Sequence, residues 1–266
     1  MNLDPDSFLA QIIEKKKKEI LVLESRGVID SLSEYRDFSF ENYSLYNALF
    51  QTKKLSLIAE LKKASPSKGL INADFDVDRL AKNYCDLGAS AFSVLTEKYF
   101  FLGDPSYILQ VKERQSLPIL RKDFIIHSLQ VYESKLLGAD AILLILDILD
   151  LSQAQELIML AKSLNLDVLV EIHSEDALDK LRELKNVNIV GINNRDLKTF
   201  KVDLNTGYKR LETLKSFMPA ETAFVAESGF TTADEMNQLY QAGFHAVLIG
   251  EGLVTHPNLS NYFASR

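Results

Sequence analysis

Residues 57–69 read LIAELKKASPSKG, a short aliphatic run that leads into Glu60 and Lys62 and then into a turn rich in serine and glycine. Seven more aliphatic runs along the chain also end in polar or glycine-bearing segments. The eight runs cover residues 55–61, 90–96, 117–123, 140–146, 167–172, 188–193, 223–229 and 245–251. Short, continuous apolar runs of this kind are typical of strands buried on both faces of a parallel sheet.

The segments between these runs carry apolar residues at helical spacing. Two examples are the sets Val77, Leu80, Ala81, Tyr84, Leu87 and Leu151, Ala154, Leu157, Ala161, Leu164. Strands and helices therefore alternate, which predicts an α/β fold built as a single (βα)8 TIM barrel over residues 55–266. An open doubly wound sheet ranks behind it, because no Gly-x-Gly-x-x-Gly turn follows an early strand.

A weak internal repeat supports the eightfold division. Gly88, Gly138 and Gly243 each lie three residues before an alanine that opens an apolar run. Glycine often ends a helix in this way. These glycines are expected to precede the second, fourth and eighth strands, at multiples of about 25 residues.

The first 54 residues lie outside the eight units. Phe8, Leu9 and Ile12 follow a helical pattern, which predicts an N-terminal helical extension over 1–54 that packs on the barrel within one catalytic domain overall. The lysine run 15–18 has acidic residues on both sides and is expected to form a solvated helix face.

Composition narrows the class of protein. The chain has 266 residues, of which 47% are hydrophobic, and this suffices for a large core. A net charge of -7 argues against nucleic acid as the main partner. The single cysteine, Cys85, excludes a disulfide framework, and no apolar run is long enough to span a bilayer. We therefore expect a cytoplasmic protein with no membrane partner. The four histidines lack the spacing of metal ligands, so we expect no metal site.

Chemistry is expected where the strands end, because active sites of such barrels form at the C-terminal ends of the strands. A strand leaving a core becomes polar in any case, so a single polar residue there decides nothing. A set of lysines and glutamates converging on one barrel mouth is costly to desolvate unless its members pair. Glycine-bearing turns at 227–229 and 249–252, after the last two strands, favour a phosphorylated small-molecule substrate.

The motifs resemble those of the indole-3-glycerol-phosphate synthase family over essentially the whole chain. The matching stretches are IAELKKASPSKG, VLTEKYFFLGD, LPILRKDFII, LLGADAILLI, VLVEIH, VGINNRDL, VAESG and LIGE. The resemblance implies a lyase of tryptophan biosynthesis that converts 1-(2-carboxyphenylamino)-1-deoxy-D-ribulose 5-phosphate to indole-3-glycerol phosphate, carbon dioxide and water. It implies no metal and no organic cofactor.

The same resemblance implies roles for four catalytic residues. Lys122 resembles the general acid of the family, in a setting near Lys62 that is expected to be positively crowded and to ease proton donation. Lys62 resembles a contact to the phosphate and hydroxyl region and a second acid. Glu171 resembles the general base, and Glu60 resembles a carboxylate that orients these groups.

Binding residues carry over in three groups. Ser65, Asn193 and Arg195 resemble residues near the substrate's carboxylate. Pro66, Phe101, Phe124 and Leu197 correspond to apolar walls, and Glu227 and Ser228 line the pocket between ring and phosphate. Gly229, Gly250 and Glu251 are expected to bind phosphate through backbone N–H groups. Two positions depart from the family pattern, Asp104 and Glu251, where serine is common; the Glu251 carboxylate is expected to turn away from the anion.

Three alternatives stay open at this level. A phosphoribosylanthranilate isomerase would need a cysteine at the end of the first strand, which this chain lacks. A Schiff-base aldolase could use Lys122 as its nucleophile. A non-catalytic barrel subunit would not need the costly charged set. A monomer or weak homodimer is expected.

Overall fold

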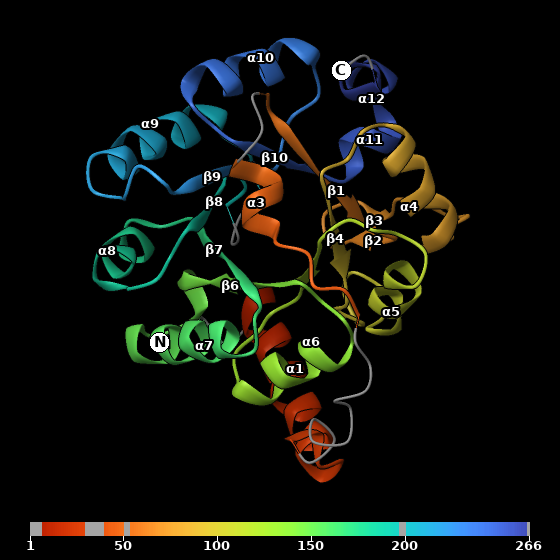
Figure 1. Ribbon diagram of the computed structural model, residues 1–266, viewed down its shortest axis with the longest axis vertical. Coiled ribbons are helices and arrows are strands. Elements are labelled where there is room, and N and C mark those ends of the chain that lie inside the picture. Colours follow the sequence, from red (N-terminus) through yellow and green to blue (C-terminus); the bar gives the residue numbers. More distant parts are fainter. Residues whose placement is uncertain (1–6, 30–39, 51–53, 197–200, 265–266) are drawn as a thin grey trace.

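A closed barrel of eight parallel strands forms the centre of the protein (Figure 1). The computed structural model describes residues 7–29, 40–50, 54–196 and 201–264. Around the barrel the strand order is β1, β10, β9, β8, β7, β6, β5, β4, and β4 pairs with β1 to close the circle. The strands are β1 (Ser56–Leu61), β4 (Ala91–Leu95), β5 (Ile119–Lys122), β6 (Ala141–Ile145), β7 (Asp167–Ile172), β8 (Ile189–Asn193), β9 (Ala223–Glu227) and β10 (Ala246–Ile249). The predicted TIM barrel and its eight strands are confirmed.

Helices form the outer layer, as Figure 1 shows. They are α4 (Val77–Asp86), α5 (Ser106–Lys112), α6 (Ser128–Leu136), the 3-10 helix η2 (Leu146–Ile148), α7 (Leu151–Ser163), α8 (Glu175–Glu183), α9 (Leu204–Lys215), α10 (Ala233–Ala242), α11 (Glu251–Thr255) and α12 (Pro257–Ala264). Gly88, Gly138 and Gly243 have φ values of 84°, 86° and 98°, and they end α4, α6 and α10 just before β4, β6 and β10. No helix in the described ranges is long and apolar enough to cross a membrane.

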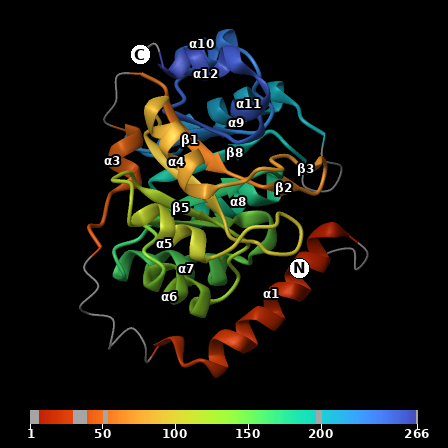
Figure 2. The same ribbon diagram turned by 90° about the vertical axis from the view of Figure 1, so that its right-hand side faces the viewer.

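Two helices in the described ranges precede the first barrel strand. The short helix α3 (Leu45–Phe50) lies at the end of the barrel where strands begin. There the backbone N–H of Tyr46 donates to Asp167 Oδ2 over 3.0 Å, and the Phe50 ring stacks on His245. The long helix α1 (Phe8–Ser25) runs outside the helical ring, and its first turn lies near the opposite end of the barrel (Figure 2). Its first two residues, Phe8 and Leu9, line the cavity described below.

A two-stranded hairpin interrupts the segment after β1. Strand β2 (Ala64–Ser65) pairs antiparallel with β3 (Gly69–Leu70). The SPSKG sequence was predicted as a loop, and it is the tip and second strand of this hairpin. The hairpin stands at the mouth of the barrel, beside the N-terminal end of α1 (Figure 2).

The lysine run on α1 is not a uniformly solvated face. Lys17 and Lys18 are exposed, but the side chain of Lys16 is only 1% exposed and lies 2.7 Å from both Asp123 and Glu19. Burial would raise the pKa of Asp123, yet the adjacent Lys16 and Arg121 cations lower it to about 2. The prediction was wrong for Lys16, because the charges near it in the sequence do not indicate its contact with Asp123, the residue that follows β5. An ion pair thus fixes α1 to the residue that follows Lys122.

Replacing Lys16 with methionine should destabilise the protein by about 3 kcal/mol, because it leaves the buried Asp123 carboxylate one cation short. The loss should be largest near neutral pH and should shrink as the pH falls toward 2, where Asp123 takes up a proton in the folded state. Urea unfolding at several pH values measures it. The matched control is Lys17→Met, on the same helix and 60% exposed, which should change stability by less than about 0.5 kcal/mol. Equal effects of the two substitutions would contradict this account.

Candidate functional site

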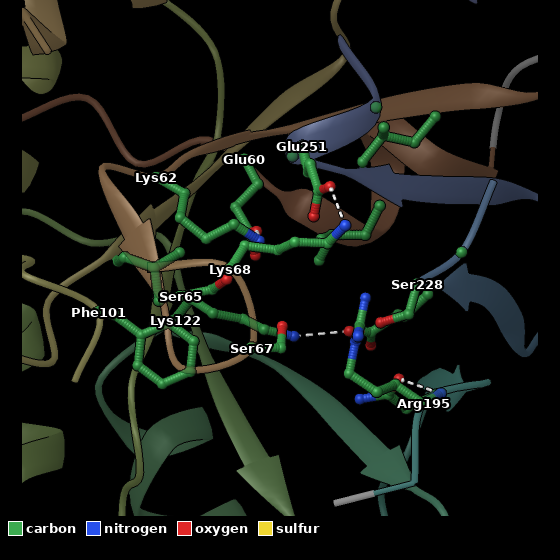
Figure 3. Close-up of a pocket in the computed structure, with 18 of the residues that line it drawn as sticks. Glu60, Lys62, Ser65, Ser67, Lys68, Phe101, Lys122, Arg195, Ser228 and Glu251 are labelled. Atoms are coloured by element: carbon green, nitrogen blue, oxygen red, sulfur yellow. Dashed lines mark hydrogen bonds and ion pairs between the residues drawn. The ribbon is translucent and has the colours of Figure 1, made fainter. Parts of the chain in front are cut away.

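A cavity of about 400 Å³ opens at the C-terminal ends of the barrel strands. It falls within the size range of sites for small organic ligands. The cavity brings together the described residues that the sequence predicted for the site, namely Glu60, Lys62, Ser65, Pro66, Phe101, Lys122, Phe124, Glu171, Asn193, Arg195, Glu227, Ser228, Gly229, Gly250 and Glu251. Figure 3 labels residues of this lining that come from strand ends, such as Glu60 and Lys122, and from the segments that follow the strands. Leu197 lies outside the described residues.

The charged residues at the end of β5 point in two directions, because successive side chains of a strand lie on opposite faces. Lys122 points into the cavity. Arg121 points toward the surrounding helices, where its guanidinium lies 2.7 Å from Glu133 on α6 and 3.2 Å from Asp123. Asp123 also accepts a hydrogen bond of 2.5 Å from Thr96 Oγ1. Arg121, Asp123 and Thr96 therefore support the wall behind Lys122.

Lys122 is bound by two carboxylates. Its Nζ lies 3.0 Å from Glu171 Oε2 on β7 and 2.6 Å from Glu227 Oε2 on β9, and its side chain is 15% exposed. Burial alone would lower the pKa of this ammonium, but Glu171, Glu227 and Glu60 outweigh burial and raise it. The expectation of a positively crowded lysine was wrong, since the nearest charges are negative. Lys122 is consequently an ammonium at all physiological pH values.

Glu171 and Glu227 both contact the Lys122 ammonium, but their pKa values shift in opposite directions. Glu171 receives a second hydrogen bond, 3.1 Å from Asn193 Nδ2, and although burial opposes it, Lys122 and Asn193 lower its pKa. Glu227 Oε1 is buried and has no hydrogen-bond partner among the residues that the structure describes. Burial and the neighbouring Glu171 raise the pKa of Glu227 to about 8, against the pull of Lys122. At neutral pH the site therefore holds a Glu171 carboxylate and a largely protonated Glu227, which is the kind of difference that assigns base and acid roles.

Glycines make room for two of these carboxylates. A Cβ atom added at Gly191 on β8 would overlap Glu227 Oε1, and one added at Gly250 would meet the Glu60 carboxylate. Glu60 in turn forms an ion pair with Lys62, which lies just past the end of β1. Only a residue without a side chain leaves room for these carboxylates, so Gly191 admits Glu227 and Gly250 admits Glu60.

The apolar wall is held by hydrogen bonds behind it. The rings of Phe101 and Phe124 face the cavity with centroids 6.2 Å apart. The buried carboxylate of Glu97 accepts bonds from the backbone N–H groups of Tyr99, Phe100 and Phe101, which fixes the loop that carries Phe101. Asp104, one of the two departures from the family pattern, accepts from the N–H of Ser106 over 2.8 Å and begins α5. Asp104 thus has a structural partner outside the cavity.

Polar groups lie at another side of the cavity. Asn193 Oδ1 accepts a bond of 3.0 Å from the backbone N–H of Arg195, and the carbonyl oxygen of Asn193 lies 3.2 Å from His173 Nδ1. His173 lies just before α8. The hydroxyl of Ser65 is buried and has no hydrogen-bond partner in the described part of the chain. Ser65, Asn193 and Arg195 all line the cavity.

The turns after β9 and β10 form a further side. Ser228 and Gly229 both have left-handed backbones, with φ values of 68° and 91°. The turn is held by Asn194, whose Nδ2 donates to the carbonyl oxygens of Glu227 and Ser228. At the other turn, the carboxylate of Glu251 lies 3.6 Å from Lys68 Nζ.

Several residues of the lining were not predicted from the sequence, and Phe8, Leu9 and Lys68 are three of them. Phe8 and Leu9 were assigned only to packing, but they reach the cavity from α1. Lys68 lies within the quoted IAELKKASPSKG stretch and was given no role. The hairpin that places Lys68 at the mouth has only two residues in each strand, too few for a detectable pattern.

Comparison with known proteins identifies relatives of this chain. The family model for indole-3-glycerol phosphate synthase matches residues 9–265. The chain is similar to the indole-3-glycerol phosphate synthase of Chlorobium luteolum, with 43% identity covering 96% of this chain and 95% of that protein. It is also similar to the indole-3-glycerol phosphate synthase of Thermoanaerobacter pseudethanolicus, with 46% identity covering 91% of this chain and 90% of that protein. Among solved structures, a chain of a tryptophan synthase complex from Pyrococcus furiosus has a similar fold. The TM-score is 0.55 and the identity is 15%, and the match covers 79% of this chain and 95% of that chain.

Replacing Glu227 with glutamine should stabilise the protein above pH 8 by about 5 kcal/mol at most. In the folded state Glu227 keeps its proton up to about pH 8, whereas in the unfolded state it loses the proton near its ordinary value of 4.5. The wild type therefore loses stability as the pH rises from about 4.5 to 8, and a neutral amide removes this loss. Urea midpoints of both proteins at pH 5, 7 and 9 test it, with Glu212→Gln on exposed α9 as the control. A midpoint difference that does not change with pH would count against the raised pKa.

Proposed function

The chain belongs to the indole-3-glycerol phosphate synthase family, and on that basis we propose that it closes the indole ring of indole-3-glycerol phosphate. The substrate is 1-(2-carboxyphenylamino)-1-deoxy-D-ribulose 5-phosphate, and the products include one carbon dioxide and one water. The observation that carries the proposal is the Lys122 ammonium between Glu171 and Glu227 inside a strand-end cavity. That arrangement supplies a proton donor and a proton acceptor within reach of one bound molecule.

The lining fits a substrate that has an aromatic ring at one end and a phosphate at the other. Phe101 and Phe124 offer apolar surface for the ring. Arg195 suits the planar carboxylate, because its guanidinium carries a fork of donors. The turns at Gly229 and Gly250 offer backbone N–H groups to the phosphate. The reacting atoms would then lie between these ends, near Lys122.

In the first step a carbon–carbon bond forms. The ring carbon that bears the carboxylate attacks the ketone carbon, and the carbonyl electron pair moves to its oxygen, which takes a proton from Lys122. The carbon–carboxylate bond then breaks, carbon dioxide leaves, and the bonding pair restores the aromatic ring. Because its pKa is raised, Lys122 enters this step in the protonated form that it requires.

In the second step water is lost. The new hydroxyl leaves with a proton from Lys62, and Glu171 takes the proton released as the indole double bond forms. Glu171 suits this role because its lowered pKa keeps it a carboxylate at neutral pH. Two protons are given and one is taken in total. The proton consumed balances the negative charge of the carboxylate that leaves as neutral carbon dioxide.

The alternatives fit less well. A Schiff-base aldolase needs a neutral lysine amine as its nucleophile. Glu171 and Glu227 hold Lys122 as an ammonium, which opposes that chemistry. The isomerase alternative needs a cysteine after the first strand, and the one cysteine of this chain, Cys85, lies on α4. Monomeric or weakly dimeric state, cytoplasmic location, and independence from metal and cofactor stay predictions.

A fluorescence assay tests the proposed reaction directly. The chain contains no tryptophan, so indole emission that appears when the purified protein meets the carboxyphenylamino-deoxyribulose phosphate reports product formation alone. We expect emission to rise without added metal or cofactor. If the substrate binds and no emission develops, another reaction must be sought, beginning with borohydride trapping at Lys122.

Replacing Lys122 with methionine should lower kcat by about 10²–10⁴-fold, the usual contribution of a general acid. KM should change less than kcat, because Lys122 acts on the reacting oxygen and the phosphate and carboxylate contacts remain. Glu171→Gln should lower kcat by a similar factor, because it removes the carboxylate while keeping the size and shape of the side chain. Lys98→Met, a lysine outside the cavity lining, serves as the control and should retain wild-type kcat. Turnover of Lys122→Met at the wild-type rate would remove Lys122 from its proposed role.

A further inference from the structure

Lys68 and Glu251 face each other across the mouth of the cavity (Figure 3). Lys68 lies at the tip of the β2–β3 hairpin, which follows the first barrel strand. Glu251 is the first residue after Gly250, at the end of the last barrel strand. The Lys68 Nζ and Glu251 Oε1 atoms are 3.6 Å apart, and the side chains are 59% and 29% exposed. This pair connects two segments that are distant in sequence and lie on either side of the opening.

The pair is loose in comparison with the other ion pairs of the cavity. A separation of 3.6 Å exceeds that of a direct charge-assisted hydrogen bond, and exposed pairs of this kind contribute little to stability. Lys122, by contrast, is 2.6 Å from Glu227 and is largely buried. Lys68 is therefore a cation of the lining that can exchange its partner at small cost. Gly69, beside it, has a φ of 66° and open space around its Cα, which suits a hairpin that shifts.

The position of Glu251 creates an electrostatic problem for a phosphorylated ligand. Glu251 directly follows Gly250 in the chain, both residues line the cavity, and the phosphate of the proposed substrate would bind at the Gly250 backbone. A carboxylate and a phosphate in one cavity repel each other, and a neighbouring cation offsets the repulsion. Lys68 Nζ is the cation placed opposite this carboxylate.

We propose that Lys68 changes partners when the substrate binds, leaving Glu251 in the empty cavity for the phosphate in the occupied one. Glu251 then holds the lysine ready at the mouth, and the phosphate, with its greater negative charge, draws the lysine and its hairpin over the substrate. Lys68 is in this sense a residue that recognises the phosphate. The inference rests on the proposed function for the identity of the substrate.

A double-substitution cycle in the fluorescence assay tests the exchange. Lys68→Met should raise KM about tenfold, the loss of one charge-assisted contact, with kcat within about twofold. Glu251→Gln should leave KM unchanged or lower it, because it removes both a competitor for Lys68 and a charge that repels phosphate. In the Glu251→Gln background, Lys68→Met should still raise KM at least about fivefold. Lys82→Met, on the exposed face of α4, is the control for loss of one positive charge and should have no effect.

Two kinetic results would overturn the exchange. An unchanged KM in Lys68→Met would show that Lys68 does not act on substrate binding. If the Lys68→Met effect disappears when Glu251 is already glutamine, Lys68 only neutralises Glu251 and does not contact the phosphate.

Thermal unfolding separates this inference from the proposed reaction. Inorganic phosphate should raise the Tm of the wild type by binding the folded state, and should raise the Tm of Lys68→Met less at the same concentration. This result would support the phosphate contact even if no indole forms, in which case the proposed reaction alone would fail. Equal rises in the two proteins would overturn the role of Lys68, whatever reaction the wild type catalyses.

Discussion

The contact of the Lys122 ammonium with the side chains of Glu171 and Glu227 is the interaction on which the rest of the site depends. Three ionisable groups are withdrawn from water into one cavity, and such groups are tolerated only when they are paired. With two acids for one base, the cluster holds an additional proton at neutral pH, which resides on Glu227. The same arrangement keeps Lys122 charged and Glu171 ionised, so the residues that we propose as acid and base hold the required protonation states before any substrate enters.

The barrel supplies the positions that this cluster requires. Lys122, Glu171 and Glu227 end strands that are not all neighbours, and only a closed sheet brings those ends around one opening. The positions are then reinforced from outside. Gly191 leaves room for Glu227, and the buried Lys16 of α1 holds Asp123, the residue after Lys122. One ion pair thus connects the N-terminal helix to the residue that follows Lys122.

Much of this architecture could be predicted from the sequence. Eight runs apolar on both faces predict a parallel barrel, and in such a barrel Glu60 and Lys62, two residues apart, must lie on the same face. The pairing of side chains could not be predicted. Adjacent residues such as Arg121 and Lys122 look equivalent in the sequence, and only the register of the closed barrel decides which one enters the cavity. The burial of Lys16 depends on how α1 packs on the barrel, and the position of Lys68 depends on where the β2–β3 hairpin lies. No local sequence pattern indicates either arrangement.

One measurement tests the central claim most directly. In protein labelled with ¹³C at the glutamate carboxyl groups, NMR can follow each carboxylate through a pH titration, with Glu227→Gln used to assign its resonance. The account predicts that Glu227 titrates near pH 8 while Glu171 titrates below the ordinary value of 4.5. Titration of Glu227 at or below 4.5 would contradict the account. Lys122 would then contact two ionised carboxylates at neutral pH, and the difference in protonation between Glu227 and Glu171 would not exist.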